Sequence, residues 1–231
     1  MFQLVTKCFN DSANYPAYAK IKKHRTALLK DDRQIEVQDF GAGSRVFKGT
    51  TRAVSKIAKN AGVSFKRQRL LHRLVNYFQI KEVLELGTSV GLGTYALGYG
   101  NYNVHIQTIE GCPNTANVAV EHFRNHGMEN IVMHNETFDA FFQHNKSIFD
   151  LVYIDGNHDK EHTLSYFYKL LERVHKDSIL IFDDIYWSPE MTEAWNEIKG
   201  HEKVTVSIDT FQWGMVFFRT EQPKQHFTLR L

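Results

Sequence analysis

The sequence predicts an α/β fold in which a mainly parallel sheet is covered by helices on both faces. Short β-branched runs alternate with helical segments from residue 82 onward, the chain pattern of a parallel sheet. The first run ends in a glycine-rich turn, V-L-E-L-G-T-S-V-G-L-G-T at 83–94. The last two runs are joined only by residues 209–212. This link is too short for a helical crossover, so the two runs should form an antiparallel hairpin.

The expected elements divide the chain into two parts. Strands are expected at 82–86, 104–109, 130–134, 149–154, 178–182, 203–208 and 213–219, with helices near 92–99, 113–126, 137–145, 160–175 and 189–199. Helical patterns at 14–30, 50–60 and 64–78 precede them, and Ser64 is a plausible N-cap. We therefore expect an N-terminal helical region at 1–79, acting as a lid or in oligomerisation, and a catalytic domain at 80–231.

Composition and length favour a soluble α/β protein. The chain has 231 residues, of which 42% are hydrophobic, enough for one such domain with a core. Cys8 and Cys112 are the two cysteines, too few for a disulfide framework, so we expect a reducing compartment. We find neither a signal-peptide pattern nor an apolar run long enough to span a membrane. These observations predict a cytoplasmic protein with no membrane partner.

The charge is unevenly distributed along the chain. Residues 1–80 hold 16 Lys and Arg against 5 Asp and Glu, and the remainder holds 12 against 21, which gives +11 and −9 and sums to the net charge of +2. A basic N-terminal part is compatible with nucleic-acid binding. The alternative is a set of solvated helix faces that also lie against the acidic part. We favour that alternative, without a nucleic-acid partner, because no aromatic residues interleave the basic ones.

The glycine-rich turn fits two kinds of cofactor. The run Gly91–Ala96 matches the dinucleotide pattern G-x-G-x-x-A, but it starts five residues after the strand ends near Leu86, whereas that fingerprint begins where the strand stops. The frame from Glu85 to Thr94 places a glycine at the turn itself, where a ligand can lie against bare main chain. A carboxylate at Glu85 suits an ammonium group better than a pyrophosphate. Glu110, after the second strand, can accept hydrogen bonds from the ribose of either cofactor.

The run E-V-L-E-L-G-T-S-V-G-L-G-T, followed by Q-T-I-E, resembles the class I S-adenosylmethionine-dependent methyltransferases over roughly residues 80–219. The resemblance implies a doubly wound, seven-stranded Rossmann-like sheet in the order 3-2-1-4-5-7-6 with the last strand antiparallel. It implies S-adenosylmethionine as the cofactor. The implied cofactor-binding residues are Glu85, Gly87, Thr88, Gly91, Gly93, Glu110, Asn135 and Asp155. For Asn135 the alternative is ordinary turn chemistry after a strand.

Three aspartates follow the fourth and fifth expected strands. Asp155 ends F-D-L-V-Y-I-D, and Asp183 and Asp184 end I-L-I-F-D-D, so all three should gather at one edge of the sheet. Such carboxylates repel one another unless a cation or a raised pKa compensates, and Mg²⁺ prefers oxygen ligands. We therefore expect a Mg²⁺ or similar cation at these residues. Adjacent strand residues face opposite ways, so the alternative is that Asp184 caps the next turn.

This half of the chain resembles the metal-dependent O-methyltransferases of the catechol and macrolide-sugar types. The catechol type has Asp-Asn where this chain has Asp183-Asp184, and a lysine base where this chain has His158. The resemblance makes Asp155 and His158 the expected catalytic residues. An imidazole can accept a hydroxyl proton near neutral pH, although a loop histidine capping the next helix is the alternative.

Three further features of the sequence concern the region around the expected site. The run His158–His162 matches the zinc-peptidase pattern H-x-x-E-H, which we reject because it straddles a loop and a helix start. Tyr186 and Trp187 are candidate walls of an acceptor pocket, and Trp195 is expected in the core. The loop F-G-A-G-S-R at 40–45 is a candidate lid whose Arg45 would pair with an anionic acceptor; an ordinary inter-helix loop is the alternative.

Together these features predict a metal-assisted O-methyltransferase that uses S-adenosylmethionine and acts on a hydroxyl of a small molecule. A homodimer built on the N-terminal region is left open. The alternatives are an RNA or DNA methyltransferase that binds through the basic N-terminal region, and a non-catalytic cofactor-binding protein. The absence of an Asn-Pro-Pro-aromatic motif in the sequence weighs against base methylation.

Overall fold

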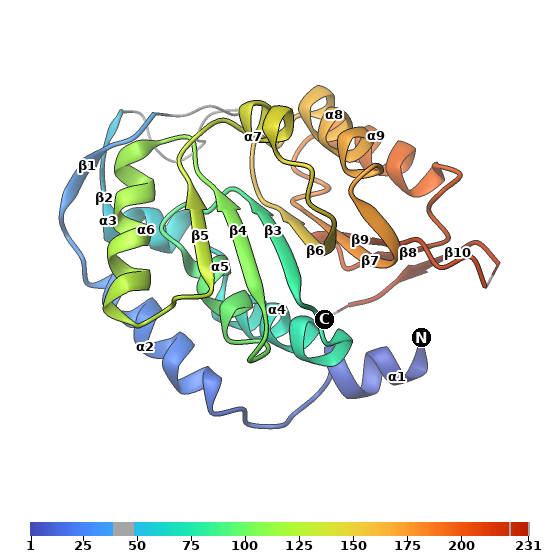
Figure 1. Ribbon diagram of the computed structural model, residues 1–231, viewed down its shortest axis with the longest axis horizontal. Helices are drawn as coiled ribbons and strands as arrows, with labels where there is room; N and C mark the ends of the chain where they lie inside the picture. Colours follow the sequence, from blue (N-terminus) through green and yellow to red (C-terminus); the bar gives the residue numbers. More distant parts are fainter. Residues whose placement is uncertain (39–48, 222, 231) are drawn as a thin grey trace.

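The computed structural model describes residues 1–38, 49–221 and 223–230, and it has a central mixed sheet of eight strands (Figure 1). The sheet order is β10-β8-β9-β7-β6-β3-β4-β5, and β9 runs antiparallel to both of its neighbours. The strands are β3 Glu82–Leu86, β4 His105–Ile109, β5 Ile131–His134, β6 Phe149–Ile154, β7 Val174–Asp183, β8 Val206–Asp209, β9 Trp213–Phe217 and β10 Gln225–Thr228.

The predicted strand count was wrong by one strand. The seven expected strands lie in the predicted relative order with β9 antiparallel, but β10 adds an eighth strand at the edge, parallel to β8 (Figure 1). The sequence of β10, Q-H-F-T, is short and mostly exposed. An edge strand of this kind lacks the buried, β-branched pattern by which strands are recognised in a sequence.

Helices cover both faces of the sheet, and each face has its own apolar core. The helices that follow the strands are α5 Leu92–Gly98, α6 Pro113–Asn125, α7 Phe138–His144, α8 Lys160–Leu170 and α9 Pro189–Gly200. Along β3, Val83 joins the core with α5 and α6, whereas Leu84 and Leu86 join the core with α7, α8 and α9. This alternation is the two-residue period of a strand that is buried on both faces.

The N-terminal region packs on the same face as α5 and α6, because its buried residues belong to that core. Its elements are α1 Phe2–Leu4, a π-helix at Val5–Phe9, α2 Ala17–Leu29, β1 Gln34–Glu36, β2 Thr51–Ala53, α3 Val54–Asn60 and α4 Phe65–Phe78. The Ser64 cap is confirmed, since its hydroxyl accepts a hydrogen bond from the backbone N–H of Arg67. The prediction missed the two-stranded β1–β2 sheet, and it assigned β2 to a helix.

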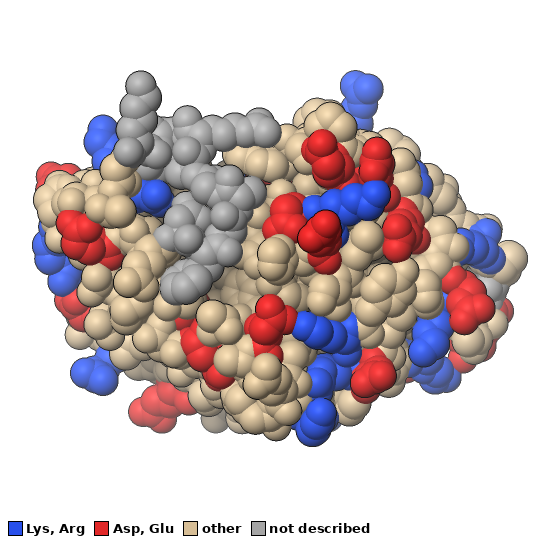
Figure 2. All heavy atoms as spheres, turned by 90° about the horizontal axis from the view of Figure 1, so that it is seen from above, with Lys and Arg blue, Asp and Glu red and all other residues tan. Residues whose placement is uncertain are grey.

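Several basic residues of this region bind other parts of the chain. Arg73 is buried and donates to the carbonyl oxygens of Cys8 and Phe9, and Arg33 pairs with Glu121 on α6 at 2.7 Å. On the face drawn in Figure 2, basic and acidic side chains are interspersed. The Arg33–Glu121 pair supports the interpretation that the basic N-terminal part lies partly against the acidic part.

Two further findings bear on the sequence predictions. The candidate lid at 40–45, including Arg45, lies outside the described residues. Among the residues that are described, none of the helices combines the length and the apolar character needed to cross a bilayer.

Candidate active site

The turn between β3 and α5, residues 87–91, has a backbone that requires glycine. Gly87 and Gly91 have φ values of +103° and +86°, in the left-handed region that favours glycine. A Cβ atom on Gly87 would lie 2.0 Å from the carbonyl oxygen of Asp155. The turn is also tied to the neighbouring strand, because the N–H groups of Gly87 and Thr88 both donate to the carbonyl oxygen of Ile109. The predicted glycine turn therefore lies directly beside the ends of β4 and β6.

Glu85 lies beneath this turn and is buried, with 1% of its surface exposed. Its carboxyl group accepts hydrogen bonds from the hydroxyls of Thr94 and Thr108, and a Cβ on Gly93 would lie 2.5 Å from its Oε1. Burial raises the pKa of Glu85 to about 8, against the lowering effect of the two hydroxyls. The hydrogen-bond partners of Glu85 are thus side chains of the protein itself, and the Glu85 carboxyl group supports the start of α5. The hydroxyl of Thr88 is also directed inward, 2.5 Å from that of Thr108.

Glu110 follows β4 and faces the glycine turn. One carboxylate oxygen accepts a hydrogen bond from the N–H of Ser89 at 2.8 Å, and the other accepts from the N–H of Cys112 at 2.9 Å. The two bonds fix the carboxylate beside the turn, where the resemblance places the ribose. Asn135 donates to the carbonyl oxygen of Glu110 at 2.7 Å, so it holds the loop after β4. This contact is the turn chemistry that was the alternative to adenine binding.

A tyrosine and an arginine connect the predicted acidic cluster. The Tyr153 hydroxyl lies 2.9 Å from Asp183 Oδ2 and 3.0 Å from Asp155 Oδ2. Arg67, from α4, donates to Asp183 Oδ1 at 3.1 Å. Burial raises the pKa of Asp183 to about 7, and the charges of Asp155 and Asp184 add to this effect. The Tyr153 hydroxyl carries one hydrogen and can donate to only one of the two carboxyl groups. Both contacts are hydrogen bonds when one of the carboxyl groups is protonated and donates to the Tyr153 oxygen.

The aspartates do not form the arrangement that the predicted cation needs. Strand β7 continues to Asp183, and the backbone then turns at Asp184, where φ is +52°. Within the described part of the chain, His, Cys, Asp and Glu side chains form no group of three or more that could hold a metal ion. A guanidinium already lies against Asp183, and the Tyr153 hydroxyl lies between Asp183 and Asp155. The residues present therefore do not fit the cation.

His158 lies close to Asp155, as predicted. Its Nε2 is 3.6 Å from Asp155 Oδ1, and the centroid of its ring is 6.1 Å from the centroid of the Trp187 ring. Burial lowers the pKa of His158, but Asp155 and the charges of Asp184 and Asp183 outweigh it and raise the pKa to about 8. The rejected zinc pattern fits no better here. His158 lies outside α8, and the N-cap Asp159 binds His162.

Sequence reasoning missed Tyr153 and Arg67. Tyr153 lies two residues before Asp155, and residues two apart in a strand share a face, so the sequence did contain a signal for it. Nothing in the sequence placed Arg67, which is 116 residues from Asp183. Trp195 is buried in the core, as expected. Tyr186 is 42% exposed and binds Asp209 through its hydroxyl, so the structure leaves its predicted role at an acceptor pocket untested.

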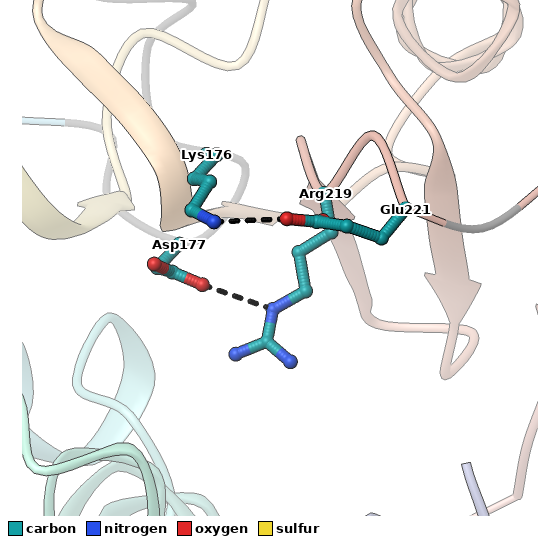
Figure 3. Close-up of a pocket in the computed structure, with 4 residues that line it drawn as sticks. All are labelled: Lys176, Asp177, Arg219 and Glu221. Atoms are coloured by element: carbon teal, nitrogen blue, oxygen red, sulfur yellow. Dashed lines mark hydrogen bonds and ion pairs between the residues drawn. The ribbon is translucent and has the colours of Figure 1, made fainter.

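A surface hollow lies away from these residues (Figure 3). It is lined by Lys176, Asp177, Arg219 and Glu221. Lys176 pairs with Glu221 at 2.8 Å and Arg219 with Asp177 at 3.2 Å, and all four side chains are at least half exposed. Lys176 and Asp177 lie on the first part of β7, whereas Asp183 ends that strand. The hollow is therefore separate from the candidate active site.

Comparisons with known proteins agree with this geometry. Residues 84–185 match a family model described as a methyltransferase domain. The comparison with curated proteins gives no match. Among solved structures, the O-methyltransferase TomG from Streptomyces achromogenes, in complex with S-adenosylmethionine, is 17% identical with a TM-score of 0.63, covering 90% of this chain and 91% of that one.

Two further structures show the same fold. A methyltransferase from Podospora anserina bound to S-adenosylhomocysteine is 13% identical, with a TM-score of 0.66 and coverage of 94% of each chain. An O-methyltransferase from Bacillus cereus, in complex with S-adenosylhomocysteine, is 15% identical, with a TM-score of 0.60 and coverage of 89% of this chain and 92% of that one. The resemblance stated from the sequence is confirmed. Residues 84–185 match a methyltransferase domain, and the chain as a whole shares the fold of these methyltransferase structures.

Proposed function

We propose that this protein is an S-adenosylmethionine-dependent O-methyltransferase that acts on a hydroxyl group of a small-molecule acceptor. The observation that supports it most strongly is the glycine turn at 87–91, which lies between the Glu110 carboxylate and the Asp155–His158 pair. The first side fits a nucleoside, and the second fits a hydroxyl that must lose a proton. Similar solved structures that hold S-adenosylmethionine or S-adenosylhomocysteine support the same cofactor here.

The cofactor fits the residues that are present. The N–H of Ser89 and that of Cys112 orient the Glu110 carboxylate, whose oxygens are suitable acceptors for ribose hydroxyls. Gly87 has no side chain, and the carbonyl oxygen of Asp155 lies where a Cβ atom would be, so the turn lies close against the end of β6. When bound, S-adenosylmethionine supplies a sulfonium methyl group, whose carbon–sulfur bond breaks as the acceptor oxygen forms a new carbon–oxygen bond.

The chain's own residues prepare the acceptor oxygen. In this proposal the neutral form of His158, which predominates above its pKa of about 8, accepts the hydroxyl proton at Nδ1, while Asp155 holds the Nε2 side of the ring. A carboxylate that orients an imidazole in this way also stabilises the imidazolium that forms. Trp187, whose ring lies 6.1 Å from that of His158, would help to exclude water. Holding the two reactants in line then supplies much of the rate.

Calorimetric titration of the purified protein with S-adenosylmethionine, S-adenosylhomocysteine and NAD tests the cofactor. We expect both adenosyl-sulfur ligands to bind and NAD not to bind. A panel of phenols, catechols and sugar hydroxyls, assayed with radiolabelled methyl donor, then tests the acceptor class. Preferential binding of NAD, or transfer to RNA or DNA but to no small molecule, would contradict the proposal.

A further inference from the structure

The acidic part of the site contains a cation supplied by the chain itself. Arg67 lies on α4 of the N-terminal region, and its Nη1 is 3.1 Å from Asp183 Oδ1 and 3.4 Å from Asp183 Oδ2. The Asp183 side chain is 6% exposed and that of Arg67 is 24% exposed. A buried carboxylate is costly unless it is paired and hydrogen-bonded, so this contact compensates the buried charge.

The guanidinium is held in place from a second side. It lies over the ring of Trp213, 5.8 Å from the centroid, at a distance typical of a cation–π contact. Trp213 is in turn the register partner of Asp183 in the β7–β9 ladder. The same pair of strands thus positions the carboxylate and the aromatic ring on which the guanidinium rests.

The remaining contacts of the cluster are also made within the chain. Asp183 Oδ1 accepts a hydrogen bond from the N–H of Asp184 at 2.8 Å, and Oδ2 lies 2.9 Å from the Tyr153 hydroxyl. The same hydroxyl reaches Asp155. A divalent cation at Asp183 would have to displace a like-charged guanidinium and would compete with both of these bonds.

We propose that Arg67 supplies the positive charge for which a divalent cation was expected, so that methyl transfer by this enzyme requires no divalent metal. Arg67 is a positioning residue here: it acts through Asp183 and Tyr153, which hold Asp155 next to His158. The prediction about turnover rests on the proposed function, whereas the prediction about metal binding does not.

The wild-type enzyme gives the first test. Turnover should change less than about twofold between excess EDTA and about 1 mM Mg²⁺. Electron paramagnetic resonance with Mn²⁺ alone should show no bound ion. A chelator that abolishes turnover, with recovery on adding Mg²⁺, would overturn the inference. Failure of S-adenosylhomocysteine to bind would instead overturn the proposed function, and the Mn²⁺ measurement would still report on Arg67.

Removing the guanidinium gives the second test. Arg67→Gln removes the positive charge that contacts Asp183, which favours binding of a hard cation there. We expect this variant to gain Mn²⁺ binding and to lose about 10²-fold in turnover, because the reacting groups are misplaced. Adding Asp183→Asn to Arg67→Gln should abolish the Mn²⁺ binding. Lys66→Gln, at an exposed position on the same helix, makes the same charge change and should alter neither readout.

Conservative replacement separates these effects from simple misfolding. Arg67→Lys keeps a positive charge beside Asp183, so it should bind no Mn²⁺ and keep more activity than Arg67→Gln. If Arg67→Gln does not fold, Arg67→Lys and the wild-type chelator test decide the question. Mn²⁺ binding by the wild type or by Arg67→Lys would overturn the inference, as would a folded Arg67→Gln with wild-type turnover.

Discussion

The cofactor half of the site is built from main chain, whereas the acceptor half is built from charged side chains. We define the cofactor half as residues 87–91 with Glu110, and the acceptor half as Asp155, His158, Asp183 and Arg67. In the cofactor half, backbone N–H groups bind the Glu110 carboxylate and the carbonyl oxygen of Ile109. In the acceptor half, the buried Asp183 carboxylate is compensated by a guanidinium and a phenol.

The difference shows where each half is sensitive to change. Main-chain geometry tolerates many side chains but few changes at glycine, because φ and the closeness of neighbouring backbone are fixed. A charged cluster tolerates small changes in shape, but it does not tolerate the loss of one partner, which leaves a buried charge unpaired. Substitutions should therefore affect cofactor binding in one half and turnover in the other.

The largest effect is expected for Gly87→Ala. Its Cβ would lie 2.0 Å from the carbonyl oxygen of Asp155, at a φ of +103°, so the turn must shift. We expect S-adenosylhomocysteine affinity to fall by more than about 10²-fold and unfolding free energy to fall by about 2–4 kcal/mol. Calorimetry and urea denaturation measure the two quantities.

Gly200→Ala is the matched control, because a Cβ there meets nothing within 4 Å. It should change neither the affinity nor the stability by a comparable amount. If Gly87→Ala binds the ligand as tightly as the wild type does, then the cofactor does not lie against this turn.

His158→Gln should act on the other half. Loss of a positioned base typically lowers the rate by 10²–10⁴-fold, and we expect about 10² in kcat. The affinity for S-adenosylhomocysteine should stay within about twofold of the wild type, because His158 lies beside Asp155 and not beside Glu110. Single-turnover methyl transfer and calorimetry give the two values. Equal losses in both measurements would show that the two halves are not separable.

The cofactor half was predictable because its signal is local in the sequence. Strand, turn and helix start follow one another within residues 83–94, and the next strand ends at Ile109, directly before Glu110. Parallel strands bring such ends together at one edge of a sheet. The order of the seven expected strands followed from the resemblance that this signal supported.

The acceptor half was predictable only in part. The strand pattern placed Asp155 and Asp183 together, but the compensating charge comes from Arg67, on a helix 116 residues away from Asp183. Within S-F-K-R-Q-R, periodicity alone does not distinguish Arg67, which contacts Asp183, from Arg69, which lies over Tyr18. A metal was inferred because the sequence shows the carboxylates and does not show their partner.

Glu85→Gln should alter the pH dependence of stability. The folded chain keeps Glu85 protonated up to a pKa of about 8, whereas its ordinary value is 4.5. Between these values the folded state binds more protons than the unfolded state, so stability falls as pH rises. We expect Glu85→Gln to remove about 2–3 kcal/mol of this decline between pH 5 and pH 8.

Urea denaturation at several pH values measures the decline in each protein. Glu129→Gln, at an exposed position, makes the same charge change and is the control, which should follow the wild-type curve. Parallel curves for Glu85→Gln and the wild type would mean that the carboxyl group under the turn is ionised in the folded state.

The smallest effect is expected for Asn135→Ala, which tests how far the cofactor half extends beyond Glu110. Asn135 is exposed, and its amide donates to the carbonyl oxygens of Glu110 and Gly111. Losing these bonds should cost about 0.5–1.5 kcal/mol of unfolding free energy. If Asn135 only holds the loop, S-adenosylhomocysteine affinity should fall less than about threefold, since each tenfold loss corresponds to about 1.4 kcal/mol. A loss of tenfold or more with S-adenosylhomocysteine, at unchanged stability, would instead assign Asn135 to the adenine and extend the cofactor half to the end of β5.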